Sequence, residues 1–152
     1  MTTDAPLDPR LVELLRQLSP QVRPERFAMV GMHPRERPVA LRLLGLVQSP
    51  FVQLISEPEL LTLLLPERDW TELRPAFRAA RVNAPLRAIS IEVDLPDDLV
   101  GLMAALSGAL ARAGVPLLAV CSFARDHLLV READLERALD ALAGLRSAQE
   151  AP

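Results

Sequence analysis

Hydrophobic residues recur along the chain with two spacings, one typical of helices and one typical of strands. Residues 9–18 repeat leucine every three or four positions behind Asp8, which predicts an amphipathic helix that Asp8 caps. Residues 88–93 alternate apolar side chains with other residues, and this spacing of two predicts a strand. The pattern as a whole predicts an α+β protein.

The first half of the chain contains short apolar runs separated by turn residues. Residues 57–59, Glu-Pro-Glu, predict the turn of a hairpin. Residues 35–47 fit a helix but also alternate as a strand does, so both interpretations stay open, with the helix favoured. Residues 81–87 include the sequence Asn-Ala-Pro and are expected to form a linker between two halves. The expected strands of this half are residues 26–32, 51–56 and 60–65, and the next expected helix is residues 67–73.

The second half has a regular order of strand, helix, strand, strand and helix. Its central helix ends before Gly114, a residue type favoured just after helix C-termini. No charged residue occurs between Leu99 and Ala111, so we expect this helix to be covered on both faces, either by the other half or by a second chain. The predicted elements are residues 88–93, 99–113, 117–123, 126–130 and 133–145.

A short internal repeat relates the two halves. Residues 63–70 align with residues 128–135, because both are an apolar strand followed by a break, then Glu-x-Asp and a large apolar residue. Repeats of this kind indicate duplicated structural units. We therefore expect two βαββα units, with the N-terminal helix and a degenerate unit in residues 1–82 and a clearer unit in residues 86–147.

Composition and charge narrow the class of protein. The chain has 152 residues, a formal net charge of −3, one tryptophan, four phenylalanines and no tyrosine. Its interspersed charges and few aromatic side chains argue against a nucleic-acid partner. A single cysteine, Cys121, excludes an internal disulfide and suits a reducing compartment. With no signal-peptide pattern and no apolar run long enough for a membrane helix, we expect a cytoplasmic protein without a membrane partner.

Candidate catalytic groups are few, and none forms a convincing set. A triad built on His127 would need Ser122 and Asp126, which lie along one predicted hairpin and more simply serve its turn. Cys121 falls within a predicted strand and is expected to be a small buried side chain. The chain is therefore expected not to be an enzyme and to carry no cofactor or metal. A weak site for a hard cation in the acidic loop at residues 94–98 stays open as a less favoured alternative.

The loop at residues 94–101 carries the most informative polar groups. It joins a predicted strand to the start of a helix, where free backbone N–H groups and the helix dipole favour an anion such as a carboxylate. Asp97 and Asp98 could attract the ammonium group of a ligand, and Gly101 allows a close approach of the backbone. These features suit a zwitterion. The simpler interpretation, in which the aspartates cap the helix, is slightly favoured.

The second half resembles the ACT superfamily of small-molecule-binding regulatory domains. In the second half, the residues that carry the resemblance are 100–102 after the first strand, 113–117 before the second, and the hairpin at 122–130. In the first half, residues 56–67 resemble the first hairpin of the branch with tandem ACT units. That branch includes cytosolic arginine sensors and uncharacterised bacterial proteins. The resemblance implies a ferredoxin-like fold in each unit, antiparallel sheets side by side with helices on one face, and a ligand bound where an ACT loop meets a neighbouring unit.

Carried onto this chain, the resemblance implies a ligand site in the loop and the adjacent hairpin. The typical Asp-x-Pro-Gly start of the ACT helix is stretched here to residues 94–101. The implied function is a homodimeric sensor that binds a small molecule, an amino acid, and changes its association with a partner protein. The alternative is an interaction or structural module of ACT fold without a ligand. The implied ligand-binding residues are Asp97, Asp98, Leu99, Val100, Gly101, Ser122 and Phe123.

Overall fold

The computed structural model describes residues 8–93, 96 and 98–148 of the chain. It divides into two compact units, and one of them is interrupted by the other in sequence. Residues 24–88 form what we term the inserted unit, and residues 1–23 together with 89–152 form the discontinuous unit. Two strands, β1 (Pro20–Met32) and β4 (Arg81–Ile91), cross the boundaries and contribute residues to both units.

The inserted unit places four strands in the order β2-β3-β1-β4. Strand β3 pairs antiparallel with both β1 and β2. The second helix of the unit, α3, follows β3 directly, and a 3₁₀ helix follows α3. Besides β1 and β4, its elements are η1 (Pro34–Glu36), α2 (Arg37–Leu44), β2 (Gln53–Ser56), β3 (Leu61–Pro66), α3 (Glu67–Leu73) and η2 (Arg74–Ala76).

Alternation along β1 and β3 creates the core of the inserted unit. From Ala28 to the end of β1, and from Leu61 to Leu65 in β3, every second residue is buried in this core, as the strand period of two requires. Ala40 of α2 and Trp70 of α3 cover that face, and the Trp70 ring stacks on Phe77 with centroids 5.7 Å apart. The buried strand residues are Ala28, Val30, Met32, Leu61, Leu63 and Leu65.

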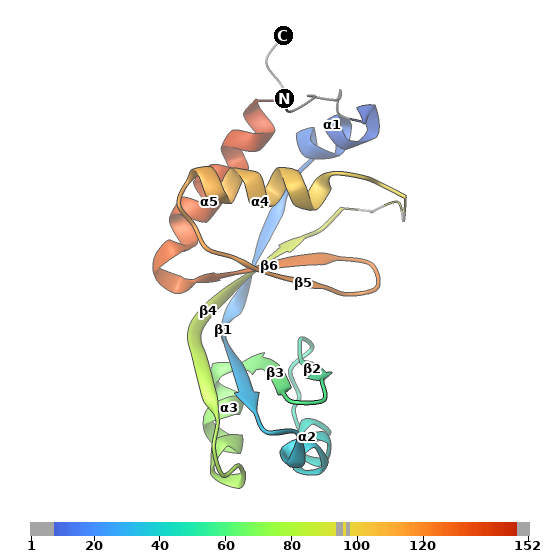
Figure 1. The fold of residues 1–152 in the computed structure, drawn as a ribbon. Helices are drawn as coiled ribbons and strands as arrows, with labels where there is room; N and C mark the ends of the chain where they lie inside the picture. The colour runs from blue at the N-terminus through green and yellow to red at the C-terminus, as the bar shows by residue number, and fades with distance from the viewer. Residues whose placement is uncertain (1–7, 94–95, 97, 149–152) are drawn as a thin grey trace. The chain divides into compact units, whose positions relative to one another are not determined.

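The discontinuous unit has the same ferredoxin-like arrangement, with strand order β1-β4-β6-β5. Figure 1 labels these strands and the helices α1, α4 and α5 of the unit. Its sheet buries Ile89, Ile91, Leu128 and Val130 against leucines of three helices. The first of these helices, α1, is capped by Asp8, whose side chain accepts a hydrogen bond from the Arg10 backbone. Its elements are α1 (Pro9–Arg16), α4 (Leu102–Arg112), β5 (Leu118–Cys121), β6 (Asp126–Arg131), η3 (Glu132–Asp134) and α5 (Leu135–Ser147), together with parts of β1 and β4.

The structure confirms the α+β class, the helix favoured within residues 35–47 and the equivalence of the two aligned repeats. In both repeats the second strand of a hairpin leads straight into a helix, β3 into α3 and β6 through η3 into α5. The buried Trp70 and Leu135 occupy the matching positions. The repeat in the sequence therefore reflects a repeated unit of structure.

The expected linker at residues 81–87 is instead the first part of strand β4. The prediction was wrong because Pro85 and its polar neighbours are typical of turns. Within the inserted unit β4 is the last strand in the order, and a proline is tolerated in such an edge strand. Residues 81–85 are exposed, which explains their polar composition.

Two further expectations differ from the structure. The central helix α4 begins at Leu102 rather than Leu99. Ala104 and Ala111 on its outer face are exposed within the one described chain, so the covering of this face by a second chain stays a prediction. Cys121 is exposed rather than buried, because β5 is the last strand in the order and its buried side chain is the neighbouring Val120. Among the described residues, no helix has the length and apolar character that crossing a membrane would need.

Candidate functional site

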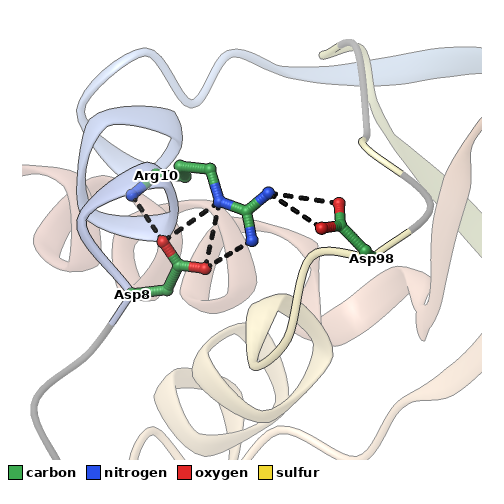
Figure 2. Close-up of polar contacts among 3 residues, drawn as sticks. All are labelled: Asp8, Arg10 and Asp98. Carbon is green, nitrogen blue, oxygen red and sulfur yellow. Dashed lines mark hydrogen bonds and ion pairs between the residues drawn. The ribbon is translucent and has the colours of Figure 1, made fainter.

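Arg10 connects helix α1 to the loop that precedes α4, both in the discontinuous unit (Figure 2). Its Nε and Nη2 atoms donate hydrogen bonds to the Asp8 carboxylate, with Nη2 2.8 Å from Oδ2. Its Nη1 atom donates to both carboxylate oxygens of Asp98 at 3.1 Å. Arg10 and Asp98 are exposed and Asp8 is partly exposed, so the contacts orient the loop more than they stabilise the fold.

Hydrogen bonds within this cluster shift the pKa values of Asp8 and Arg10 in the directions that favour their charged forms. Hydrogen bonds from the Arg10 side chain hold the pKa of Asp8 below its ordinary value. The pKa of Arg10 is raised, first by its hydrogen bonds with Asp8 and then by those with Asp98. The salt bridges to Asp8 and Asp98 place the Arg10 guanidinium between two carboxylates.

Gly101 fixes the end of the same loop. Its φ of 100° lies in the left-handed region that favours glycine, and it occupies the N-cap position of α4 without a capping side chain. A Cβ at this position would lie 3.0 Å from the Cδ2 atom of Leu11 in α1. The start of α4 and helix α1 are thus packed as closely as a glycine permits.

A cleft of about 740 Å³ lies between α1 and the end of β4. Its polar lining includes the carboxylates of Glu13 and Glu92 and the guanidinium of Arg10. Glu92 also forms an ion pair of 3.8 Å with Arg125, which extends the charged surface to the β5–β6 turn. The full lining is Pro9, Arg10, Glu13, Leu14, Gln17, Glu92, Val93, Pro96 and Leu99. Apolar walls with a few charged groups are typical of small-molecule sites.

The region from β4 to α5 also matches a known family. Residues 81–144 fit the family model of the ACT domain. This part of the chain therefore resembles an ACT domain. The match includes the whole of β4, the loop before α4 and the β5–β6 hairpin. ACT domains are regulatory modules.

Solved structures show the same fold over most of the chain. A protein of unknown function from Vibrio cholerae, described as a possible transport protein, has a TM-score of 0.70 and 24% identity, covering 90% of this chain and 97% of that one. The regulatory subunit of aspartate kinase from Thermus flavus has a TM-score of 0.67 and 13% identity, covering 84% of this chain and 97% of that one. A protein from Agrobacterium tumefaciens has a TM-score of 0.65 and 20% identity, covering 80% and 84%. No curated protein sequence matches the chain.

The ACT loop brings some of the expected ligand-binding residues to the cleft. Leu99 lines it, and Asp98 lies at its margin through the ion pair with Arg10. Val100 is 77% exposed, and Gly101 caps α4. Asp97 lies outside the described residues. Asp98 therefore pairs with α1 instead of capping the ACT helix, which was the simpler interpretation of the sequence.

The two expected residues of the hairpin lie in the β5–β6 turn and do not line the cleft. The Ser122 hydroxyl and backbone N–H both donate to the Arg125 carbonyl oxygen, at 3.1 and 2.8 Å, and so close the turn. Phe123 is fully exposed. The residue of this turn that approaches the cleft is Arg125, through its ion pair with Glu92.

Sequence reasoning missed the contribution of α1 to the site. The pattern of residues 9–18 indicates which face of this helix is apolar, but it does not indicate what the polar face meets. The partner of Arg10 is 88 residues away, so no local spacing could have linked Arg10 to Asp98. Glu92 comes directly after the last residue of β4. Its position next to the loop is the feature of the sequence that could have indicated it as a residue of the site.

His127 has a structural role elsewhere in the ACT domain. Its Nδ1 atom lies 2.9 Å from the hydroxyl oxygen of Ser90, and the Nε atom of Arg23 donates to the same hydroxyl at 3.2 Å. Burial, and then the positive charge of Arg23, lower the pKa of His127. Because His127 and Ser90 are 3% and 1% exposed, the pair is inaccessible to a substrate. His127 thus contacts Ser90 and not Ser122, the residue that a hairpin triad would require.

Proposed function

We propose that this protein is a cytoplasmic regulatory protein that binds a small molecule, an amino acid, beside the loop between β4 and α4. Ligand binding would change its association with a partner protein, and a homodimer is the assembly that we expect. The observation that carries the proposal is the cleft of about 740 Å³ at the start of the ACT helix α4. A single cysteine cannot form an internal disulfide, which suits a reducing compartment.

The lining of the cleft has the chemistry that an amino acid needs. The carboxylates of Glu13 and Glu92 suit an ammonium group, and the Arg10 guanidinium suits a carboxylate. Leu14 and Leu99 offer apolar surface for a side chain. A ligand that bridges α1 and the loop would hold them together more firmly than the exposed ion pair does alone. Ligand binding would therefore change the shape of this surface.

The best test is a thermal-shift screen of the full chain against the twenty standard amino acids and common nucleotides. A ligand at one hundred times its Kd adds about 2.7 kcal/mol of stability. We expect one amino acid to raise Tm clearly, and light scattering with and without that compound then reports the change in assembly.

Matched variants connect such a shift to the cleft. Glu92→Gln and Asp98→Asn remove charges at the site and should reduce the shift. Glu136→Gln removes a carboxylate from α5 and should leave it unchanged. A shift that survives both site variants would place the ligand elsewhere.

The alternative function, an interaction module without a ligand, is favoured by one specific observation. Val100 and Phe123 are large apolar side chains that are almost entirely exposed in the ACT domain. Exposed apolar side chains are used in protein contacts when they gather in a patch. No response to any compound in the screen, with an assembly that Phe123→Ser disrupts, would support this alternative.

A further inference from the structure

The inserted unit has a cleft of its own where helix α3 ends and the chain turns towards β4. Its volume is about 450 Å³, which lies within the usual range for sites that bind small molecules. The 3₁₀ helix η2 forms one part of its wall, and the residues that lead into β4 form the rest. The lining consists of Arg74, Pro75, Phe77, Arg78, Ala79 and Ala80, all of which belong to the inserted unit.

The charged groups that line this cleft are all positive. They are the guanidinium groups of Arg74 and Arg78, and in the described part of the chain no Asp or Glu lines the cleft with them. Residues 73–91 contain four arginines and no acidic residue, although the whole chain has a formal net charge of −3. A cleft lined by one sign of charge concentrates ions of the opposite sign. The cleft is therefore suited to an anion, whereas the cleft beside α1 combines carboxylates with a guanidinium.

The two arginines are not neutralised by other groups of the protein. Among the residues that the structure describes, neither Arg74 nor Arg78 forms an ion pair or a side-chain hydrogen bond. Both are exposed, so a ligand can reach their N–H donors without first breaking an existing pair. Arg68 of α3 differs in this respect, because its Nε atom lies 3.7 Å from the carboxylate of Asp69.

Phe77 fixes the backbone between the two arginines. Its backbone N–H donates to the carbonyl oxygen of Arg74 at 3.0 Å, which closes the turn. Its ring stacks on the buried Trp70, with centroids 5.7 Å apart and an angle of 28° between the ring planes. Pro75 restricts the backbone further, because its ring fixes φ. A ligand would therefore have to order two side chains but not the backbone that carries them, which limits the entropy lost on binding.

We propose that this cleft binds the phosphate group of a small phosphomonoester. Such a phosphate carries a charge of about −1.5 to −2 at neutral pH and has three strong acceptor oxygens, so it matches two guanidinium groups better than a carboxylate with one negative charge does. Arg74 and Arg78 donate N–H groups to the phosphate oxygens, for which the planar guanidinium is well suited. Pro75 and Phe77 offer apolar surface to the rest of the ligand.

This proposal is independent of the proposed function. It uses another cleft, other residues and another class of ligand, so either can fail without the other. Backbone amide signals of Phe77, Arg78 and Ala79 would report the cleft of the inserted unit. Signals of Leu99 and Gly101 would report the cleft beside α1, so one set of NMR spectra tests the two sites separately.

The experiment is an NMR titration of the ¹⁵N-labelled full chain with phenyl phosphate, at an ionic strength of about 0.15 M so that weak surface attraction is screened. We expect shifts in the amide signals of Phe77, Arg78 and Ala79, and in the indole signal of Trp70, the single tryptophan of the chain. Phenol lacks the phosphate and benzoate has one negative charge, so both should bind more weakly. Inorganic phosphate lacks the apolar group and should also bind more weakly than phenyl phosphate.

Substitutions at the two arginines complete the test. Arg74→Gln and Arg78→Gln should each raise the Kd for phenyl phosphate about tenfold or more, the loss expected for one charge-assisted hydrogen bond. Arg42→Gln is the matched control, because Arg42 is an exposed arginine of α2 that does not line the cleft, and it should leave the Kd unchanged.

Three results would each overturn the proposal. The first is that phenyl phosphate shifts none of the signals of Phe77, Arg78 and Ala79. The second is that inorganic phosphate or benzoate binds as tightly as phenyl phosphate, since the cleft would then attract anions without recognising a phosphomonoester. The third is that both site variants bind phenyl phosphate as the wild type does.

Discussion

At the scale of single residues, Asp8 makes the junction between α1 and the ACT loop sensitive to acid. Its pKa is held below the ordinary value of 3.8 by Arg10. A carboxylate with a lowered folded-state pKa stabilises the fold above its unfolded pKa, and this contribution is lost as pH falls through the folded-state value. We expect the hydrogen-exchange protection of the Arg10 and Leu11 amides to fall, relative to α5, as pH drops below 3.8.

Asp8→Asn is the matched control for this prediction. Asparagine retains an oxygen that can cap the helix but does not titrate. The variant should therefore show little acid-dependent loss of protection in α1. An equal loss in the wild type and the variant would mean that another group controls the acid response.

A second pH dependence is expected from His127, which is a base, whereas Asp8 is an acid. Burial lowers its pKa below the ordinary 6.5, with Arg23 and Arg125 acting in the same direction and Asp126 and Glu92 against it. Because the unfolded chain takes up a proton more readily than the folded one, the free energy of unfolding should fall as pH drops below 6.5. The fall has a limiting slope of about 1.4 kcal/mol per pH unit for one group.

Urea unfolding between about pH 8 and pH 5 checks this prediction. His127→Gln keeps a polar group near Ser90 and removes the titration, so its stability should depend less on pH than that of the wild type. His33→Gln removes the other histidine, which is exposed, and should leave the wild-type dependence intact. Parallel pH profiles for the wild type and His127→Gln would contradict the assignment.

Some residues of the site could be predicted from the sequence, and others could not. Leu99 and Asp98 could be placed at a loop beside a helix start, because the strand and helix spacings on either side are visible in the sequence. Arg10 could not, since its contact with Asp98 depends on how α1 packs in three dimensions. Cys121 was expected to be buried because strand periodicity alone does not reveal that its strand is an edge strand.

At the scale of elements, Gly101 determines where α4 begins. Helical spacing of apolar residues continues back to Leu99, so the pattern predicted a longer helix, but the backbone at Gly101 has φ of 100°. Gly101→Ala should lower the free energy of unfolding by about 1–3 kcal/mol, because alanine is strained there and its Cβ would crowd Leu11.

Gly144→Ala provides the comparison within the same unit. Gly144 lies inside α5 and has nothing within 4 Å of an added Cβ, so alanine should stabilise the protein by about 0.5–1 kcal/mol. Urea unfolding of both variants gives the two changes. If Gly101→Ala were also stabilising, the close packing of α1 against the start of α4 would be contradicted.

At the scale of the whole molecule, the two units keep separate hydrophobic cores. The main cluster of the inserted unit consists of buried residues between Ala28 and Trp70. The core of the discontinuous unit combines the four leucines at positions 11, 14, 15 and 18 with residues from Ile89 onward. The internal repeat predicted two units from the sequence. It did not reveal that one unit interrupts the other, because contacts between residues so far apart leave no local pattern.

Chain fragments distinguish the boundaries expected from the sequence, 1–82 and 86–147, from the units of the structure. Residues 24–88 contain a complete core and four strand segments, so we expect this fragment to unfold cooperatively in urea. Residues 86–147 lack the leucines of α1 and the strand segment at 20–23, so we expect no cooperative transition. Fusing residues 8–23 to this fragment through a flexible Gly/Ser linker should restore one.

The fusion isolates the role of the N-terminal helix, because it adds only the missing parts of one core. A control fusion with Leu11 and Leu15 both changed to Ser has the same length but cannot rebuild that core, since both leucines are fully buried. Restoration by the first fusion and not by the control would show that α1 is part of the ACT unit. Cooperative unfolding of residues 86–147 alone would instead favour the boundaries drawn from the sequence, and α1 would then be an addition that serves the cleft rather than the fold.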